Sequence, residues 1–190
     1  MKKIIAGVDE VGRGSLIGPV YAAAVILNSN IDKTKLKDSK KISRLKRKIL
    51  EKYIKKNSVW AIGSASLSEI EKFNILNASL LAMKRAIKKL KKKPQLVLID
   101  GNKIPKLKNY KLRNIIKGDQ KIPEISAASI VAKVSRDKLI TKMSKKFGKY
   151  YWDKNFGYGT KQHINAIKKF GITKHHRKNF RPAHNILSLK

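Results

Sequence analysis

The sequence contains no cysteine, and acidic residues are scarce in it. The lack of cysteine excludes disulfides, thiolate catalysis and cysteine-ligated zinc. No apolar run approaches the roughly 20 residues that a membrane-spanning helix needs. The apolar stretch after Met1-Lys2-Lys3 reaches Asp9 too early for a signal peptide. We therefore expect a soluble cytoplasmic protein.

Basic residues, in contrast, are abundant. The 190 residues include 46 Lys and Arg but only 12 Asp and Glu, which gives a formal net charge of +34. Such a charge attracts polyanions, and nucleic acid is the obvious candidate. A genome-wide bias toward lysine would explain the same excess, with clusters such as Lys91-Lys92-Lys93 acting only as solvated helix ends. Charge alone therefore does not separate a nuclease from a ribosomal protein.

The hydrophobic pattern predicts strands that alternate with helices. Strands are expected at 2–8, 20–27, 58–65, 95–99 and near 113–117, and helices at 43–56, from 66 to about 90, and from 123 to about 147. The residues after Gly148 fit loop plus one or two helices. The link between the first two strands is too short for a crossover helix, so these strands should be antiparallel. We predict an α/β protein with one mixed central sheet.

The helix that begins near residue 66 is the most clearly marked element. Ser66 and Glu69 have the spacing of a capping box, and Pro94 marks the end of the helix. Apolar residues recur at three- and four-residue spacing, which predicts a buried stripe. The stripe consists of Ile70, Phe73, Leu76, Leu80, Met83, Ile87 and Leu90.

Three of the few acidic sites follow expected strands and adjoin glycine or a glycine-rich turn. They are Asp9-Glu10, Asp100-Gly101 and Gly118-Asp119. Strand ends of an α/β sheet lie along one edge, where binding sites form. Carboxylates gathered there would repel one another, and a hard cation such as Mg²⁺ or Mn²⁺ would remove that repulsion. Two such ions, roughly 3.5–4 Å apart, suit phosphodiester hydrolysis.

The adjacent acids Asp9 and Glu10 pose a geometric problem, because neighbours in a strand point to opposite faces. Both reach one site only if the strand ends or bends there, and Gly12 and Gly14 supply that freedom. Taken alone, the pair also fits an ordinary strand-to-turn junction with solvated acids.

The residues around these acids extend the pattern over nearly the whole chain. The ordered blocks are Asp9–Val20, Asp38–Ser43, Asn74–Ala78 with Ala82-Met83, Ile99–Asn102, Lys117–Asp119, Ile125–Asp137, Gly157–His163 and His176–Pro182. Together they resemble type 2 ribonuclease H (ribonuclease HII). Val11, Ser15 and Ile17 stand where Ala, Pro and Ala or Val are common in that family, and none of these departures removes a functional group.

The resemblance implies a ribonuclease H-like fold: a central mixed five-stranded sheet flanked by helices. One catalytic domain would span 1–190, with a C-terminal helical extension at about 145–190. The implied enzyme is an endoribonuclease that hydrolyses the RNA strand of RNA–DNA hybrids. It would also cleave 5′ of single ribonucleotides in duplex DNA, leaving 5′-phosphate and 3′-hydroxyl ends. Its partners would be these nucleic acids, and the protein would be a monomer.

The resemblance also implies two divalent ions, Mn²⁺ or Mg²⁺, held by Asp9, Glu10, Asp100 and Asp119. Asp9 would bridge the two ions. Glu10 and Asp100 would help to hold one ion, and Asp119 would hold the other. These four acids are thus the expected catalytic residues.

Substrate-binding residues follow from the same resemblance. Gly12-Arg13-Gly14 would read the ribose 2′-hydroxyl at an RNA–DNA junction, since glycine permits close approach of the backbone. Tyr158 would stack on the deoxyribose that follows the ribonucleotide. Ser39, Lys40 and Lys41 would contact backbone phosphates, which position a duplex without reading its sequence.

Two alternatives stand beside this hypothesis. Type 3 ribonuclease H has an extra N-terminal domain, for which a first strand near residue 3 leaves no room. A non-catalytic nucleic-acid-binding or ribosomal protein would explain the charge but not the acids at strand ends. Among the other polar residues, Asp137 beside Arg136 is expected either in a structural ion pair or in support of the metal ligands, and no histidine is assigned to a metal.

Overall fold

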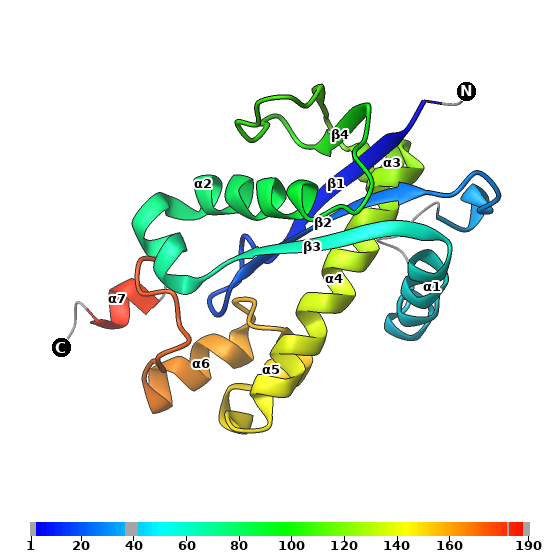
Figure 1. The fold of residues 1–190 in the computed structure, drawn as a ribbon. Helices are drawn as coiled ribbons and strands as arrows, with labels where there is room; N and C mark the ends of the chain where they lie inside the picture. Colours follow the sequence, from blue (N-terminus) through cyan, green and yellow to red (C-terminus); the bar gives the residue numbers. More distant parts are fainter. Residues whose placement is uncertain (1–2, 37–41, 182, 188–190) are drawn as a thin grey trace.

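A five-stranded sheet forms the centre of the computed structural model, which describes residues 3–36, 42–181 and 183–187 (Figure 1). The strands lie in the order β3-β2-β1-β4-β5. Their bounds are Ile5–Val11 (β1), Val20–Leu27 (β2), Ser58–Ala65 (β3), Leu96–Asp100 (β4) and Leu112–Ile115 (β5). β1 pairs with β2 in the antiparallel sense and with β4 in the parallel sense. The predicted mixed sheet is therefore confirmed.

Two long helices cover opposite faces of the sheet (Figure 1). α2 (Leu67–Lys88) packs on β2 and β3, and α4 (Pro123–Ser144) packs on β1 and β2 beside α1 (Arg44–Lys56). The shorter helices are η1 (Lys33–Leu36), α3 (Gly118–Lys121), η2 (Gly148–Tyr150), α5 (Trp152–Asn155), α6 (Lys161–Phe170) and α7 (Ala183–Leu187). Within the described ranges, no helix is both long enough and apolar enough to span a bilayer.

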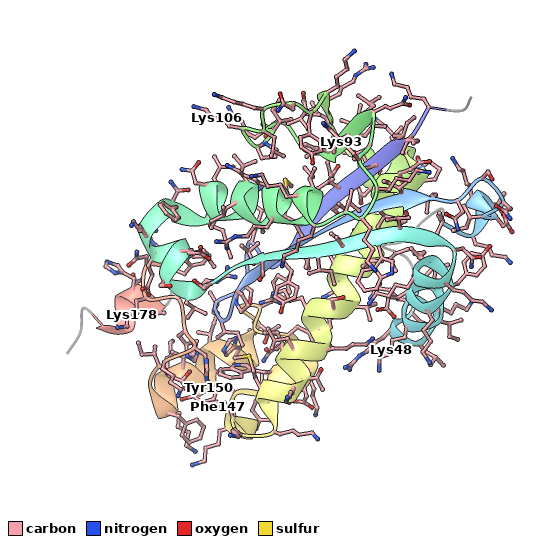
Figure 2. All side chains as sticks on the ribbon, viewed as in Figure 1. Lys48, Lys93, Lys106, Phe147, Tyr150 and Lys178 are labelled. Carbon is pink, nitrogen blue, oxygen red and sulfur yellow. The ribbon has the colours of Figure 1, made fainter. Side chains whose placement is uncertain are left out.

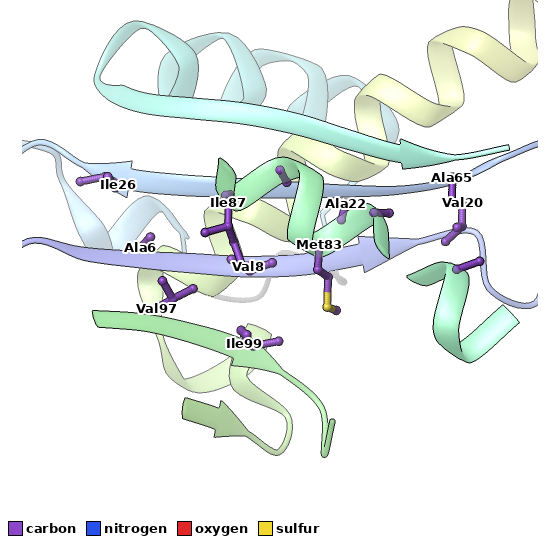
Figure 3. Close-up of a cluster of buried hydrophobic side chains, with 14 of the residues drawn as sticks. Ala6, Val8, Val20, Ala22, Ile26, Ala65, Met83, Ile87, Val97 and Ile99 are labelled. Atoms are coloured by element: carbon purple, nitrogen blue, oxygen red, sulfur yellow. The ribbon is translucent and has the colours of Figure 1, made fainter. Parts of the chain in front are cut away.

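Side chains of the central strands alternate between two cores. Ala22 and Ala24 of β2 belong to the cluster that packs against α2 (Figure 3), whereas Ala23 and Val25 belong to the cluster that packs against α4. This alternation is what a strand buried on both faces requires. At Gly7 of β1, a Cβ atom would lie 2.0 Å from the backbone of α4. The first turns of α4 therefore lie directly on β1.

A third cluster joins the C-terminal segments to the rest of the chain. Trp152 and Ile167 pack there with Ile140 of α4 and with Leu16 and Ile17 from the loop between β1 and β2. The residues after Gly148 form three short α-helices among those described, where one or two were expected. Because this cluster includes the β1–β2 loop, the C-terminal part of the chain helps to shape that loop.

The expected course of α2 is wrong in one place. The capping box of Ser66 and Glu69 is present, but Asn74 has φ 65° and ψ 167°, which interrupts the helix. The Asn74 side chain accepts a hydrogen bond from the Asn77 amide and so caps the second half. The break changes the direction of the preceding turn, and Phe73, expected in the buried stripe, is 40% exposed.

Candidate active site

A pocket of about 500 Å³ lies at the edge of the sheet where β1 and β4 end. Because these strands are parallel, their carboxyl ends meet there. Asp9, Glu10 and Asp100 all line this pocket. The loop at 12–14 contributes to it, as do Arg47, Ser129, Lys133 and Tyr158. The structure thus brings three of the four expected acids to one place.

The path of β1 explains how two neighbouring acids face one pocket. The first strand was expected to end at residue 8, before the acids. Instead, β1 continues to Val11 and stays paired with β2. Its pairing with β4 stops at Val8, opposite Ile99. Beyond that point β1 has a strand partner on one side only. The acids therefore lie along an opened edge, although the strand itself is regular.

Asp9 is the most shielded acid in the pocket, with 6% of its surface exposed. Burial raises the pKa of Asp9 well above its usual value, and the charges of Glu10 and Asp100 raise it further. A hydrogen bond with the Ser129 side chain and one from the Glu10 amide, at 2.7 Å, oppose this rise. Ser129 belongs to α4, and sequence reasoning gave it no role.

Glu10 faces similar repulsion but has a basic partner. Burial raises the pKa of Glu10, the Arg13 guanidinium lowers it, and the charge of Asp100 raises it. Arg13 Nη1 and Glu10 Oε1 are 3.3 Å apart. Asp9, Glu10 and Asp100 are therefore an electrostatically strained group of hard oxygen ligands, and a divalent cation would relieve that strain.

The donor set fits such a cation by its chemistry, but the side chains do not yet enclose one. Among the described residues, no three acidic or histidine side chains are arranged to hold a metal ion. Binding would therefore require the carboxylates to turn toward a shared ion. All three acids already line the same pocket.

Asp119, the fourth expected acid, lies next to this group rather than in it. The Gly118 amide donates to Asp100 Oδ1 at 2.7 Å, which places the adjacent Asp119 close to the pocket. Asp119 itself is buried in α3 and lines a separate cavity of about 340 Å³ with Lys33 and Ser126. A strand end was expected for Asp119, but the residue lies in the first turn of a short helix.

The loop from Gly12 to Gly14 is built differently at its two glycines. Gly12 has φ 92°, and a Cβ atom there would lie 2.2 Å from Arg136 Nε. Gly14 has open space around it, with nothing within 4 Å of an added Cβ atom. Gly12 is therefore required by the fold, whereas Gly14 leaves room for a molecule in the pocket.

Arg136 does not pair with its neighbour Asp137. Asp137 instead pairs with Lys133, one helical turn earlier, at 2.9 Å. The predicted structural ion pair of Asp137 is present, but its partner is another residue. Arg136 points to the other side of α4, where it is fully buried beneath the loop at 12–19.

Tyr158 reaches the pocket from the C-terminal part of the chain. It forms an isolated antiparallel bridge with Ser15, and the Lys133 ammonium lies 5.5 Å from its ring centre. His163 supports its backbone: the Trp152 indole donates to His163 Nε2 at 3.0 Å, so His163 Nδ1 carries the proton and donates to the Tyr158 carbonyl, also at 3.0 Å. Burial lowers the pKa of His163, and the hydrogen bond to the Tyr158 carbonyl opposes this shift.

Some expected residues lie elsewhere, and others were missed. Ser39, Lys40 and Lys41 fall outside the described residues. Arg47 of α1, to which sequence reasoning assigned no role, lines the pocket. Lys133 of α4 also lines it.

Comparison with known proteins gives a consistent result. The family model described as ribonuclease HII matches residues 6–184. A ribonuclease HII from Pelagibacter ubique is 75% identical over 185 residues, which cover 97% of this chain and 100% of the relative. One from Neisseria meningitidis serogroup B is 47% identical over 189 residues, covering 99% and 97%. The ribonuclease H2 structure from Pyrococcus horikoshii superimposes with a TM-score of 0.80 at 26% identity, covering 97% of each chain.

Proposed function

Because the chain belongs to the ribonuclease HII family of RNA-hydrolysing enzymes, we propose that it cuts the RNA strand of RNA–DNA hybrids and cuts 5′ of single ribonucleotides in duplex DNA. One observation carries the finer part of this proposal. Asp9, Glu10 and Asp100 share a pocket with the loop at 12–14 and with Tyr158. The acids supply ligands for hydrolysis, and the loop and the tyrosine supply contacts to sugars.

Members of this enzyme class depend on divalent metal ions, and we propose two Mg²⁺ or Mn²⁺ ions at this site. Asp9, Glu10 and Asp100 would hold them, with Asp119 joining from α3. When bound, such ions lower the pKa of the attacking water and neutralise charge on the phosphodiester. The raised pKa of Asp9 supports this assignment, since a cation would restore the charged carboxylate.

The residues of the chain have separate tasks in this proposal. The exposed Gly14 allows a sugar to approach the backbone, where an amide can bond the 2′-hydroxyl. Tyr158 would pack on the next sugar, and its flat ring would favour a deoxyribose over a second ribose there without excluding the ribose. Arg47 and Lys133 would contact phosphates at the pocket wall. In-line attack by water, with the 3′ oxygen leaving, gives a 5′-phosphate and a 3′-hydroxyl.

The remaining charge does not mark one surface. Figure 2 shows Lys48, Lys93, Lys106 and Lys178 projecting from widely separated parts of the ribbon. This distribution supports general attraction to nucleic acid and equally a lysine-rich composition. A monomeric state and a cytoplasmic location stay predictions.

Cleavage of labelled substrates tests the proposal. A hybrid with a labelled RNA strand and the matching duplex with one ribonucleotide are incubated with the protein and Mg²⁺ or Mn²⁺. We expect cuts within the RNA strand, one cut 5′ of the single ribonucleotide, and products that a 5′-phosphate-dependent exonuclease degrades. Products with a 2′,3′-cyclic phosphate would refute the mechanism, because they arise when the 2′-hydroxyl and not water attacks.

A further inference from the structure

Two arginines are buried beneath the loop that connects β1 to β2. Arg136 of α4 is 0% exposed, and Arg177, which follows α6, is 1% exposed. Within the described part of the chain, neither donates a hydrogen bond to a carboxylate. Burial and the charge of Arg136 lower the pKa of Arg177 to about 9, so it remains a cation at neutral pH. Burying two like charges together is unfavourable. Apolar packing does not explain why two arginines are buried here.

The hydrogen bonds of Arg177 give such a reason. Its Nη1 donates to the Arg13 carbonyl at 2.8 Å, and its Nε donates to the Gly18 carbonyl at 3.0 Å. In a trans peptide, a carbonyl and the N–H that follows it point in opposite directions. Since the Arg13 carbonyl points inward to Arg177, the Gly14 N–H points outward, toward the pocket that Gly14 lines. Arg177 therefore sets the direction of the amide that faces a bound sugar.

Arg136 joins this loop to the turn that carries Tyr158. Its Nη2 donates to Ser15 Oγ at 2.7 Å, and its Nη1 donates to the Phe156 carbonyl at 3.1 Å. Ser15 Oγ also lies 3.1 Å from the Gly157 carbonyl and 3.1 Å from the Ile17 carbonyl, and its one proton is shared between these two acceptors. The guanidinium and the hydroxyl thus tie together two segments that are far apart in sequence. They fix where the ring of Tyr158 lies relative to the loop.

We propose that Arg136 and Arg177 are positioning residues that hold the Gly14 amide and the Tyr158 ring at the spacing of one ribonucleotide followed by one deoxyribonucleotide. This inference rests on the proposed function and extends it to residues that touch no substrate. The guanidinium holds its donors in a fixed planar fork, whereas a lysine ammonium sits on a flexible stem, so lysine would not hold the two carbonyls in the same geometry. Ser15 has a share in the same task, because its hydroxyl links Arg136 to Gly157.

The two substrates respond differently to a displaced loop. Every nucleotide of the RNA strand in a hybrid carries a 2′-hydroxyl, so a displaced Gly14 amide can still bond to one of them. A duplex with a single ribonucleotide offers one hydroxyl and one junction, and it depends on the spacing between the amide and the ring. Loss of positioning should therefore lower kcat on the single-ribonucleotide duplex more than on the hybrid. KM should change less, because phosphate contacts remain.

The experiment compares Arg177→Lys, Arg177→Met and Ser15→Ala with the unchanged protein. For each, kcat and KM are measured on both substrates, and Tm is measured by circular dichroism. We expect the ratio of kcat/KM, single-ribonucleotide duplex over hybrid, to fall about tenfold or more for the Arg177 variants. It should fall severalfold for Ser15→Ala, which keeps both arginines.

Arg85→Met is the matched control. Arg85 also holds a backbone carbonyl, that of Ser64 at 2.8 Å, and it pairs with Glu69 on α2. Its loss should lower Tm and leave the substrate ratio unchanged. An unchanged ratio in both Arg177→Lys and Ser15→Ala would overturn the inference, even if Arg177→Met fails to fold. Absence of cleavage of either substrate by the unchanged protein would instead contradict the proposed function.

Discussion

Replacing Gly12 by alanine should destabilise the fold, whereas replacing Gly14 should not. Gly12 has φ 92°, and the new methyl group would lie 2.2 Å from Arg136 Nε. Arg136 cannot swing away without losing hydrogen bonds to Ser15 and to the Pro19 carbonyl. A strained backbone costs about 1–3 kcal/mol, and overpacking costs about the same. We therefore expect Gly12→Ala to lower the free energy of unfolding by roughly 2–6 kcal/mol.

Urea unfolding, monitored by circular dichroism, measures this loss of free energy. In thermal unfolding of a chain of this length, Tm should fall by roughly 5–20 °C. Gly14→Ala is the control: its φ is not positive, and its added methyl group meets nothing within 4 Å. That variant should unfold within about 0.5 kcal/mol of the unchanged protein, although the methyl group should impair cleavage. Equal unfolding midpoints for the two variants would refute our account of the loop.

Three further predictions concern the pocket and Asp119 beside it. Asp9→Asn should stabilise the metal-free protein by about 1–3 kcal/mol at pH 7, with little difference near pH 4, as urea unfolding in EDTA would measure. The pKa of Asp9 is raised in the folded protein, so the cost of burying its charged carboxylate grows as pH rises from the pKa of the unfolded chain through that of the folded protein. Equal stability of the variant and the unchanged protein at both pH values would refute the proposed repulsion among the acids. Tyr158→Ala should lower kcat/KM on single-ribonucleotide DNA about tenfold or more, while Tyr158→Phe keeps most activity; full activity of the alanine variant would end the junction-sensing proposal. Asp119→Asn should raise the Mn²⁺ concentration for half-maximal cleavage about tenfold or more, and an unchanged value would remove Asp119 from the metal site.

The sheet and the acids were accessible from sequence because their signals are local. A buried strand, an acid and a glycine in succession indicate the end of a strand, and Asp100 lies at one. The length of β1 was not accessible, since it depends on where β4 stops pairing. Asp119 lies in a short helix because the backbone of Lys117 takes the left-handed conformation, with φ 55°. No local sequence pattern predicted this conformation.

The supporting residues were missed for a different reason. α4 is buried on most of its surface, so its sequence gives no polar face that would single out Ser129 or Arg136. Arg177 lies in the block His176–Pro182, but nothing in that block separates a buried arginine from the many exposed cations of this chain. Only the packed structure shows that its guanidinium lies against the Arg13 carbonyl. The sequence likewise put Arg136 next to Asp137 but did not show that their side chains point to different sides of α4, where Asp137 pairs with Lys133.

Cleavage of a duplex with one embedded ribonucleotide tests the central claim most directly, namely that the shared acids form the metal-dependent catalytic site. Single-turnover rates are compared for the unchanged protein, Asp9→Asn and Asp32→Asn, each with Mn²⁺ and each after addition of EDTA. Asp32 is an acid outside the pocket and serves as the control. The account predicts a metal-dependent cut 5′ of the ribonucleotide by the unchanged protein and by Asp32→Asn, and a rate at least about a hundredfold lower for Asp9→Asn. Normal cutting by Asp9→Asn would contradict it.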